Sequence, residues 1–69
     1  MISRLDRSFQ QVRQFVADAS HELRTPLTAI RGEAEVALLG SLTPEEYQRS
    51  IRSILESSER MSEVVESLL

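Results

Sequence analysis

The chain carries a single histidine, His21, and a carboxylate follows it directly at Glu22. A neutral imidazole is a competent nucleophile near pH 7. A neighbouring carboxylate can hold one ring N–H and leave the other ring nitrogen free to attack an electrophile. This pair therefore predicts covalent catalysis by imidazole. The alternative is a solvated surface histidine that takes part in no reaction.

Two other chemistries that use histidine fit the spacing poorly. The zinc-protease motif would need a second histidine at position 25, where the chain has Thr25. A Ser-His-Asp triad would need Ser20 and His21 to meet, but neighbouring helix residues project about 100° apart. With Cys 0 there is also no thiolate ligand. We therefore expect neither a metal site nor a cofactor site in this chain.

A long helix is predicted near residues 3–39. The step from Leu23 to Leu27 interrupts its coiled-coil spacing, and Pro26, which has no N–H, lies inside that step. We expect a kink at Pro26, and we expect His21 and Thr25 on the outer face. The predicted seam of this helix consists of apolar or small residues that recur three and four apart. They are Ile2, Leu5, Phe9, Val12, Val16, Ala19, Leu23, Leu27, Ile30, Ala34 and Ala37.

A second helix is predicted near residues 44–69, after a turn near residues 40–43. Thr43 and Glu46 have the spacing of a capping box, and Pro44 stands at the first helical position. The apolar spacing of this helix again alternates four and three. Its predicted seam consists of Tyr47, Ile51, Ile54, Ser58, Met61, Val65 and Leu68.

The predicted fold class is all-α, an antiparallel helical hairpin. At 1.5 Å per residue the first helix is roughly 55 Å long and the second roughly 39 Å. The second helix should therefore cover the first only to about residue 14. The uncovered apolar residues predict a homodimer: two hairpins form a four-helix bundle, and the two N-terminal overhangs form a parallel coiled coil.

The composition excludes several classes of partner. The chain has 8 Lys+Arg against 11 Asp+Glu and a net charge of -3, which argues against nucleic acid, because nucleic-acid binding needs a basic surface. No apolar run approaches the ~18 residues of a membrane span. We therefore expect contact with a membrane only through segments outside this chain. The absence of cysteine fits a cytoplasmic setting.

Residues 15–32 resemble the H-box of the sensor histidine kinases of two-component systems. They read Phe-Val-Ala-Asp-Ala-Ser-His-Glu-Leu-Arg-Thr-Pro-Leu-Thr-Ala-Ile-Arg-Gly. The resemblance extends over the whole chain, which is similar to the dimerisation and histidine phosphotransfer domain, called DHp or HisKA. By this resemblance residues 1–14 correspond to the signalling helix that leaves a HAMP linker, and residues 15–69 to the DHp hairpin. The segment is also similar to kinases of the heavy-metal-sensor type.

The resemblance implies a role for each residue of the motif. One nitrogen of His21, normally Nε2, would attack the γ-phosphate of ATP, and Glu22 would orient the ring and accept its proton. The hydroxyl of Thr25 would position water for dephosphorylation of the response regulator. Pro26 would let the helix bend during these steps. Arg24 would contact phosphate or a docked domain, or would simply pair with a nearby glutamate.

The resemblance also implies partners that this chain does not contain. ATP and Mg²⁺ would be held by a catalytic domain of the same protein, so this segment alone should be inactive. The phosphoryl group would pass to an aspartate of a response-regulator receiver domain. The whole would be the cytoplasmic portion of a bacterial inner-membrane sensor. Two alternatives are a scaffold module with a vestigial His21 and a phosphorelay intermediate without kinase activity.

Overall fold

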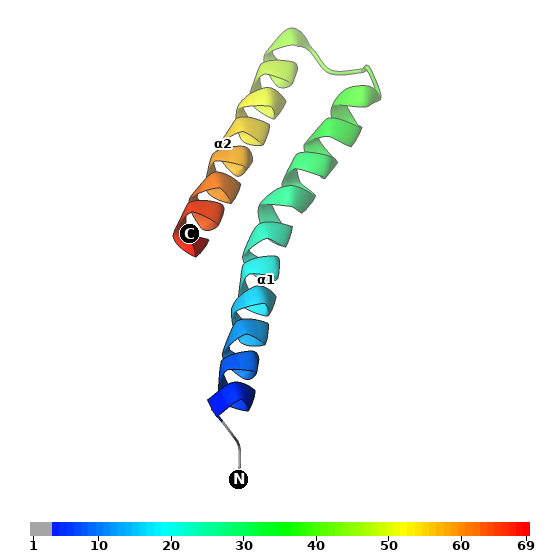
Figure 1. Cartoon of the computed structure of the whole chain (residues 1–69). Coiled ribbons are helices and arrows are strands. Elements are labelled where there is room, and N and C mark those ends of the chain that lie inside the picture. Colours follow the sequence, from blue (N-terminus) through cyan, green and yellow to red (C-terminus); the bar gives the residue numbers. More distant parts are fainter. Residues whose placement is uncertain (1–3) are drawn as a thin grey trace.

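The computed structural model describes residues 4–69, which form two antiparallel helices joined by a short connection (Figure 1). Helix α1 spans Arg4–Leu38 and helix α2 spans Pro44–Leu68. Residues 4–69 contain no strand. The predicted all-α hairpin is confirmed, and each helix end lies within one residue of its predicted position. Ile2, a predicted seam residue, lies outside the described residues.

Gly40 ends α1. The N–H groups of Leu39 and Gly40 donate to the carbonyls of Val36 and Ala37 at 3.1 and 3.2 Å. Gly40 has a φ of 77°, a left-handed conformation that a residue with a Cβ adopts only at a cost. A glycine in this conformation just past the last helical turn is a common way to end a helix. It turns the chain towards α2.

The predicted capping box at the start of α2 is confirmed. The backbone N–H of Thr43 donates to Glu46 Oε1 at 3.1 Å, and the backbone N–H of Glu46 donates to Thr43 Oγ1 at 3.2 Å. Hydrogen bonds from Thr43, chiefly from its backbone N–H, hold the pKa of Glu46 below its ordinary value of 4.5. Two N–H groups that would otherwise lack partners are therefore satisfied within one turn.

Tyr47 ties the two helices together next to the turn. Its hydroxyl donates to the backbone carbonyl of Ala37 at 3.3 Å. Leu42 and Tyr47 are both half-buried. This hydrogen bond joins the first turn of α2 to the last turn of α1, so it helps to set where along α1 each turn of α2 lies. The sequence placed Tyr47 in the seam but did not predict this bond.

Along the part of α1 that packs against α2, the partly covered residues follow the predicted seam, and Pro26 takes the place of Leu27. Pro26 is buried, whereas the predicted Leu27 is 45% exposed. The proline ring thus takes the inward position in the step where the coiled-coil spacing breaks. The other residues that the hairpin partly covers on α1 are Ala19, Leu23, Ile30, Glu33, Ala34 and Ala37.

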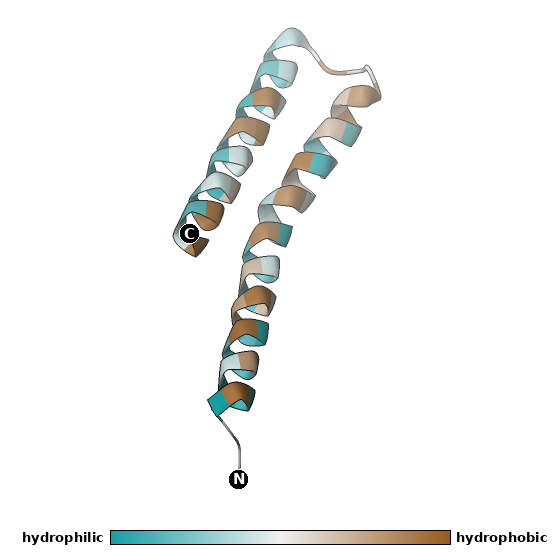
Figure 2. Ribbon diagram, viewed as in Figure 1, coloured by the Kyte–Doolittle hydropathy of each residue, from teal (hydrophilic) through white to brown (hydrophobic). Residues whose placement is uncertain are grey.

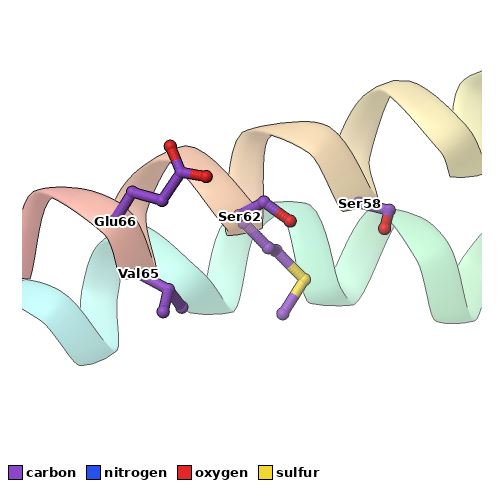
Figure 3. Close-up of a pocket in the computed structure, with 5 residues that line it drawn as sticks. Ser58, Ser62, Val65 and Glu66 are labelled. Carbon is purple, nitrogen blue, oxygen red and sulfur yellow. The ribbon is translucent and has the colours of Figure 1, made fainter.

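On α2 only every second predicted seam residue faces α1. Tyr47, Ile54, Met61 and Leu68 are half-buried as predicted. Ile51, Ser58 and Val65 are exposed, so their assignment to the contact with α1 is wrong. Figure 3 shows Ser58, Ser62 and Val65 around an open hollow on α2, which Met61 and Glu66 complete.

Serines and one valine take the positions that the prediction gave to those three residues. Ser50 is only 8% exposed, and Ser57 and Val64 are half-buried. Small side chains let two helix backbones approach closely. A pattern built on apolar residues alone passes over such serines, which explains the error. The apolar stripe of α2 is therefore wider than the face that α1 covers.

The hairpin by itself has no apolar core. Apart from Pro26, no apolar residue within residues 4–69 is buried. The molecule measures 62 × 20 × 9 Å with a radius of gyration of 17.7 Å, against about 11 Å for a compact domain of this length. Figure 2 shows hydrophobic segments in brown along both helices, including the part of α1 that extends beyond α2.

The uncovered part of α1 is longer than predicted. Leu5, Phe9, Val12 and Val16 are 73%, 68%, 60% and 56% exposed, and Ala19 is the first residue of α1 that is partly covered. The expectation that α2 would reach about residue 14 is therefore wrong by about one turn. In Figure 1 the first turn of α2 lies beyond the last turn of α1, so α2 ends correspondingly earlier along α1.

Glu46→Gln tests the capping box through its pH dependence. Because the pKa of Glu46 is lowered in the folded chain, its contribution to stability is present above about pH 4.5 and is lost as the pH falls through the folded value. Glutamine keeps an acceptor oxygen but does not titrate. Urea unfolding at fixed protein concentration should give a higher free energy of unfolding for the wild type than for Glu46→Gln at about pH 6, and this difference should shrink towards about pH 3.

Glu45→Gln is the matched control, since Glu45 is an exposed carboxylate of the same turn that takes no part in the capping box. The difference in free energy of unfolding between Glu45→Gln and the wild type should vary less over the same pH range. An equal pH dependence in both variants would contradict the assigned role of Glu46.

Candidate functional site

His21 lies on the outer face of α1, close to the point where the hairpin gives way to the uncovered segment. Its side chain is exposed, while Ala19 and Leu23 on either side of it are half-buried against α2. The predicted outward position of the imidazole is therefore confirmed. Two residues along a helix correspond to a rotation of about 200° about its axis. Ala19 and Leu23 face α2, and His21 is two residues from each of them, so His21 points away from α2.

The neighbours of His21 along this face are small or polar. Thr25 and Thr28 follow at one and two turns, and both are exposed. Gly32 comes next, and a Cβ at Gly32 would meet nothing within 4 Å. Gln14 and Asp18 precede the ring, joined by a hydrogen bond of 3.0 Å from Gln14 Nε2 to Asp18 Oδ1. No bulky apolar side chain on this stripe shields the imidazole.

The other predicted polar site residues are exposed as well. Glu22, Arg24 and Thr25 form no side-chain hydrogen bond or ion pair within the described part of the chain. The predicted pairing of Arg24 with a nearby glutamate is absent there. The ion pair that the structure shows joins Arg31 to Glu35 at 3.9 Å. Glu22, Arg24 and Thr25 are thus available to an incoming molecule.

Pro26 differs from the other predicted site residues, because it is buried on the side towards α2. Helix α1 continues through it without a break from Arg4 to Leu38. Pro26 has no N–H to donate, so the carbonyl of Glu22 lacks its usual partner four residues on. The turn from Glu22 to Pro26, which directly follows His21, therefore has one fewer backbone hydrogen bond.

The geometry favours surface chemistry with a docked partner. An imidazole on a convex helix face is accessible, but nothing around it excludes water or encloses a substrate. Residues 4–69 contain no group of three or more His, Cys, Asp or Glu side chains that could hold a metal ion. His21 can act as a nucleophile or an acceptor here, and a second domain must supply the walls of any closed site.

Comparison with known proteins decides the family. The model of the His Kinase A (phospho-acceptor) domain matches residues 11–69. The chain belongs to this family. The match includes His21, most of α1 and the whole of α2, so the resemblance extends from the motif over most of the chain. No solved structure gives a significant match.

Several curated sensor proteins are similar to this HisKA chain over most or all of its length. The sensor protein IrlS of Burkholderia pseudomallei is 41% identical over 69 residues, which is 100% of this chain and 15% of that protein. The sensor protein CopS of Pseudomonas syringae pv. tomato is 41% identical over the whole chain and 14% of its own length. The probable sensor histidine kinase TcrY of Mycobacterium tuberculosis is 50% identical over 58 residues, 84% of this chain and 12% of its own.

The chain thus spans 12% to 15% of the length of these relatives. The structure brings four of the five predicted site residues, His21, Glu22, Arg24 and Thr25, to the exposed surface of a little more than one turn of α1. It sets Pro26 apart on the inner side. The hydrogen-bonded pair of Gln14 and Asp18 was not singled out from the sequence, although its spacing of four residues is a signal for such a pair.

Proposed function

We propose that this chain is the phosphoacceptor and dimerisation domain of a sensor histidine kinase, with His21 as the residue that is phosphorylated. The single observation that carries the proposal is an exposed, unique imidazole on a helix face within a HisKA domain. Small neighbours leave room for a docked domain around the ring. The name of the relative TcrY, a probable sensor histidine kinase, supports the same class.

The proposed reaction follows from the chemistry of imidazole. The lone pair of Nε2 attacks the γ-phosphorus of ATP, and the bond from that phosphorus to the bridging oxygen breaks, so that ADP leaves with the electron pair. The ring proton on Nδ1 passes to Glu22, which leaves a neutral phosphoramidate ring on His21. A carboxylate oxygen of a response-regulator aspartate then attacks the phosphorus, the N–P bond breaks, and the ring takes up a proton.

ATP and Mg²⁺ are assigned to a separate catalytic domain of the same protein. The described residues do not fit a magnesium site, and His21 stands on an open surface. When bound to ATP, Mg²⁺ neutralises charge on the phosphates. The part of this chain is to present the nucleophile, and its exposed face fits both that domain and the receiver domain in turn.

Two further residues of the exposed turn are given roles in this proposal. Thr25 stands four residues after His21, hence about 6 Å along the same face. Its hydroxyl positions a water molecule against the phosphorylated regulator. Arg24 carries a positive charge without an ion pair in residues 4–69 and contacts phosphate or the docked domain.

We propose a homodimer as the working form. The exposed apolar residues of α1 and α2, together with the lack of an apolar core within residues 4–69, support a second copy as the occupant of these faces. Two hairpins would form a four-helix bundle, and the overhangs before Ala19 would pair as a parallel coiled coil. Relatives called sensor proteins support a place in the cytoplasmic portion of a bacterial inner-membrane protein. Neither helix within residues 4–69 is long and apolar enough to cross a membrane.

His21→Gln tests the phosphoacceptor role. Incubating the chain with Mg-ATP and the catalytic domain of the same protein should give acid-labile, base-stable label on the wild type and none on the variant. Far-UV circular dichroism should be unchanged, because His21 is exposed and makes no contact that supports the hairpin. Label that persists in the variant would overturn the assignment.

Thr25→Ala tests the phosphatase role. Phosphorylation of His21 should proceed at the wild-type rate, while dephosphorylation of the regulator should slow by about tenfold or more, because a positioned water is lost. Thr28→Ala is the matched control, since Thr28 is an exposed threonine on the same face. Equal losses in both rates for Thr25→Ala would refute a specific role for its hydroxyl.

Phe9→Glu tests the paired overhang. Phe9 is 68% exposed and lies outside the hairpin contact, so a charge there should leave each hairpin folded. Burying two such charges in a coiled-coil seam should weaken dimerisation by about tenfold or more. Analytical ultracentrifugation measures the dissociation constant, with Gln10→Glu as an exposed control of equal charge. Unchanged dimerisation of Phe9→Glu would exclude this seam.

A further inference from the structure

We propose that two copies of this chain recognise each other through charged residues at the edges of one apolar face. Arg31 and Glu35 on α1 of one copy lie against Glu59 and Arg52 on α2 of the other copy. This inference rests on the homodimer of the proposed function. It adds which helix of one copy lies on which helix of the other, and which charges align them.

With one exception, the large apolar residues that stay exposed on the two helices within residues 19–68 share one broad face. Each directly follows a residue that the hairpin covers, so it lies about 100° round the helix axis from that residue. Because the helices are antiparallel, this rotation brings both sets to the same side of the flat hairpin. These residues form the apolar face: Leu27, Leu38, Ile51, Leu55 and Val65. The exception is Val36, which precedes the covered Ala37 and lies on the opposite side.

The exposed area of a single copy fits a partner as large as a second copy. The chain exposes 6071 Å² of surface. A compact protein of 7.8 kDa exposes about 4,400 Å². The excess of about 1,700 Å² is larger than the roughly 800 Å² that each partner buries in a standard interface, and it is typical of an obligate homodimer. A second copy carries the same apolar face and therefore fits as its occupant.

A two-fold axis can bring two such faces together in two ways. With the axis parallel to the helices, α1 of one copy lies on α2 of the other, and the overhangs leave at the same end. With the axis across the helices, α1 lies on α1, and the overhangs point in opposite directions. Leu5, Phe9 and Val12 of the overhang are 60% to 73% exposed. The parallel axis lets two overhangs cover each other, so the apolar overhang favours α1 on α2.

On α1 two charged residues stand at the edge of the apolar face. Arg31 is four residues after Leu27, and Glu35 is three residues before Leu38. Residues three or four apart are neighbours on a helix surface. The side chains of Arg31 and Glu35 are 75% and 71% exposed, and their ion pair of 3.9 Å keeps both at this edge. The acidic residue is the one nearer the connection.

On α2 two charged residues flank Leu55 in the same way. Arg52 is three residues before it, Glu59 is four residues after it, and both are exposed. Arg52 also lines an open hollow together with Ile51 and Leu55. Here the basic residue is the one nearer the connection, so the order of charges is opposite to that on α1.

The heights of these charges along the bundle also match. An axis parallel to the helices keeps each residue at its own height, so the stagger of the hairpin holds between copies as well. The covered residues begin at Ala19 on α1 and end at Leu68 on α2, which places these two residues level. Glu35 and Arg52 are each 16 residues from these ends, so they lie level with each other.

The second pair is nearly level. Arg31 and Glu59 are 12 and 9 residues from the same ends, which separates them by about 4.5 Å along the axis. Their long side chains can span this difference. Arg24 and Glu66, the next charges along the two edges, again have opposite signs. Exposed ion pairs add little affinity, but like charges placed together repel, so these charges select the register and the partner helix.

Exchanging the charges within each edge tests this pairing without changing the net charge. The α1 exchange is Arg31→Glu with Glu35→Arg, and the α2 exchange is Arg52→Glu with Glu59→Arg. In a homodimer of either variant like charges meet on both sides of the axis. The dissociation constant, measured by analytical ultracentrifugation, should therefore rise by about tenfold. The rise should shrink in about 1 M NaCl, where the Debye length is only about 3 Å.

Mixing the two variants should restore the pairing, because each exchanged edge then meets its opposite. We expect this after refolding the α1 exchange together with a ¹⁵N-labelled α2 exchange from urea. Native mass spectrometry should find about nine-tenths of the dimers mixed if each homodimer is weakened tenfold. Labelled and unlabelled wild type should give about half, the random proportion. Mixed dimers would also show that both variants fold.

The matched control exchanges Glu56→Arg with Arg60→Glu. Both residues are exposed on α2, and Arg60 directly precedes the covered Met61, so this pair lies on the side opposite to the apolar face. It should leave the dissociation constant unchanged. An equal rise in this control, unchanged dissociation constants in the α1 and α2 exchanges, or mixed dimers in the random proportion would overturn the pairing. A monomeric wild type would overturn the homodimer itself, whereas a wild-type dimer that tolerates both exchanges would refute this pairing alone.

Discussion

Two helices that pack side by side have no interior, and most features of this molecule follow from that constraint. Each helix can bury only the stripe that faces its partner, so residues on either side of the stripe keep contact with solvent. A slab 9 Å thick therefore leaves every apolar residue within residues 4–69, except Pro26, at least partly exposed. The hydrophobic effect is proportional to the area removed from water, so a single copy uses little of what its apolar residues could contribute.

Interactions at the connection between the helices contribute to the register of α2 along α1. Gly40 ends α1, the Thr43–Glu46 capping box starts α2, and the hydroxyl of Tyr47 reaches the carbonyl of Ala37. The first two are local to the connection, and the Tyr47 hydrogen bond, which joins the two helices, helps to set which turn of α2 lies beside which turn of α1. Once the register is set, Pro26 faces inward and the phase of the helix carries His21 to the outside.

The site is open for the same reason. A residue on the outer face of a two-helix hairpin, such as His21, is accessible but unsheltered, so any walls that enclose its chemistry must come from another domain. Phosphoryl transfer depends on positioning and on electrostatic stabilisation more than on covalent groups of the protein. A chain of the HisKA family can therefore present an accessible imidazole and leave nucleotide binding to another domain.

Some features of this molecule are determined by the local sequence, and others by the packing of the two helices. Capping, the glycine turn and the heptad spacing depend on residues within a few positions of one another, so the sequence alone determined the two helices, their ends and the outward position of His21. The motif around His21 likewise indicated the family, because residue types and their spacing contain this information directly. The partners of each residue across the hairpin depended on the tertiary structure instead. Ile51, Ser58 and Val65 continue the apolar spacing of α2, yet Ser50, Ser57 and Val64 face α1. Spacing alone cannot decide between these two sets of residues. The apolar stripe of α2 is wider than the face that α1 covers, so α2 could rotate slightly about its axis and still pack part of the same stripe against α1. The stagger of α2 along α1, and with it the boundary at Ala19, depended on the path of the connection. The sequence thus determined which residues form helices and which chemistry they carry, and the packing of one helix on the other decided which sides remain free.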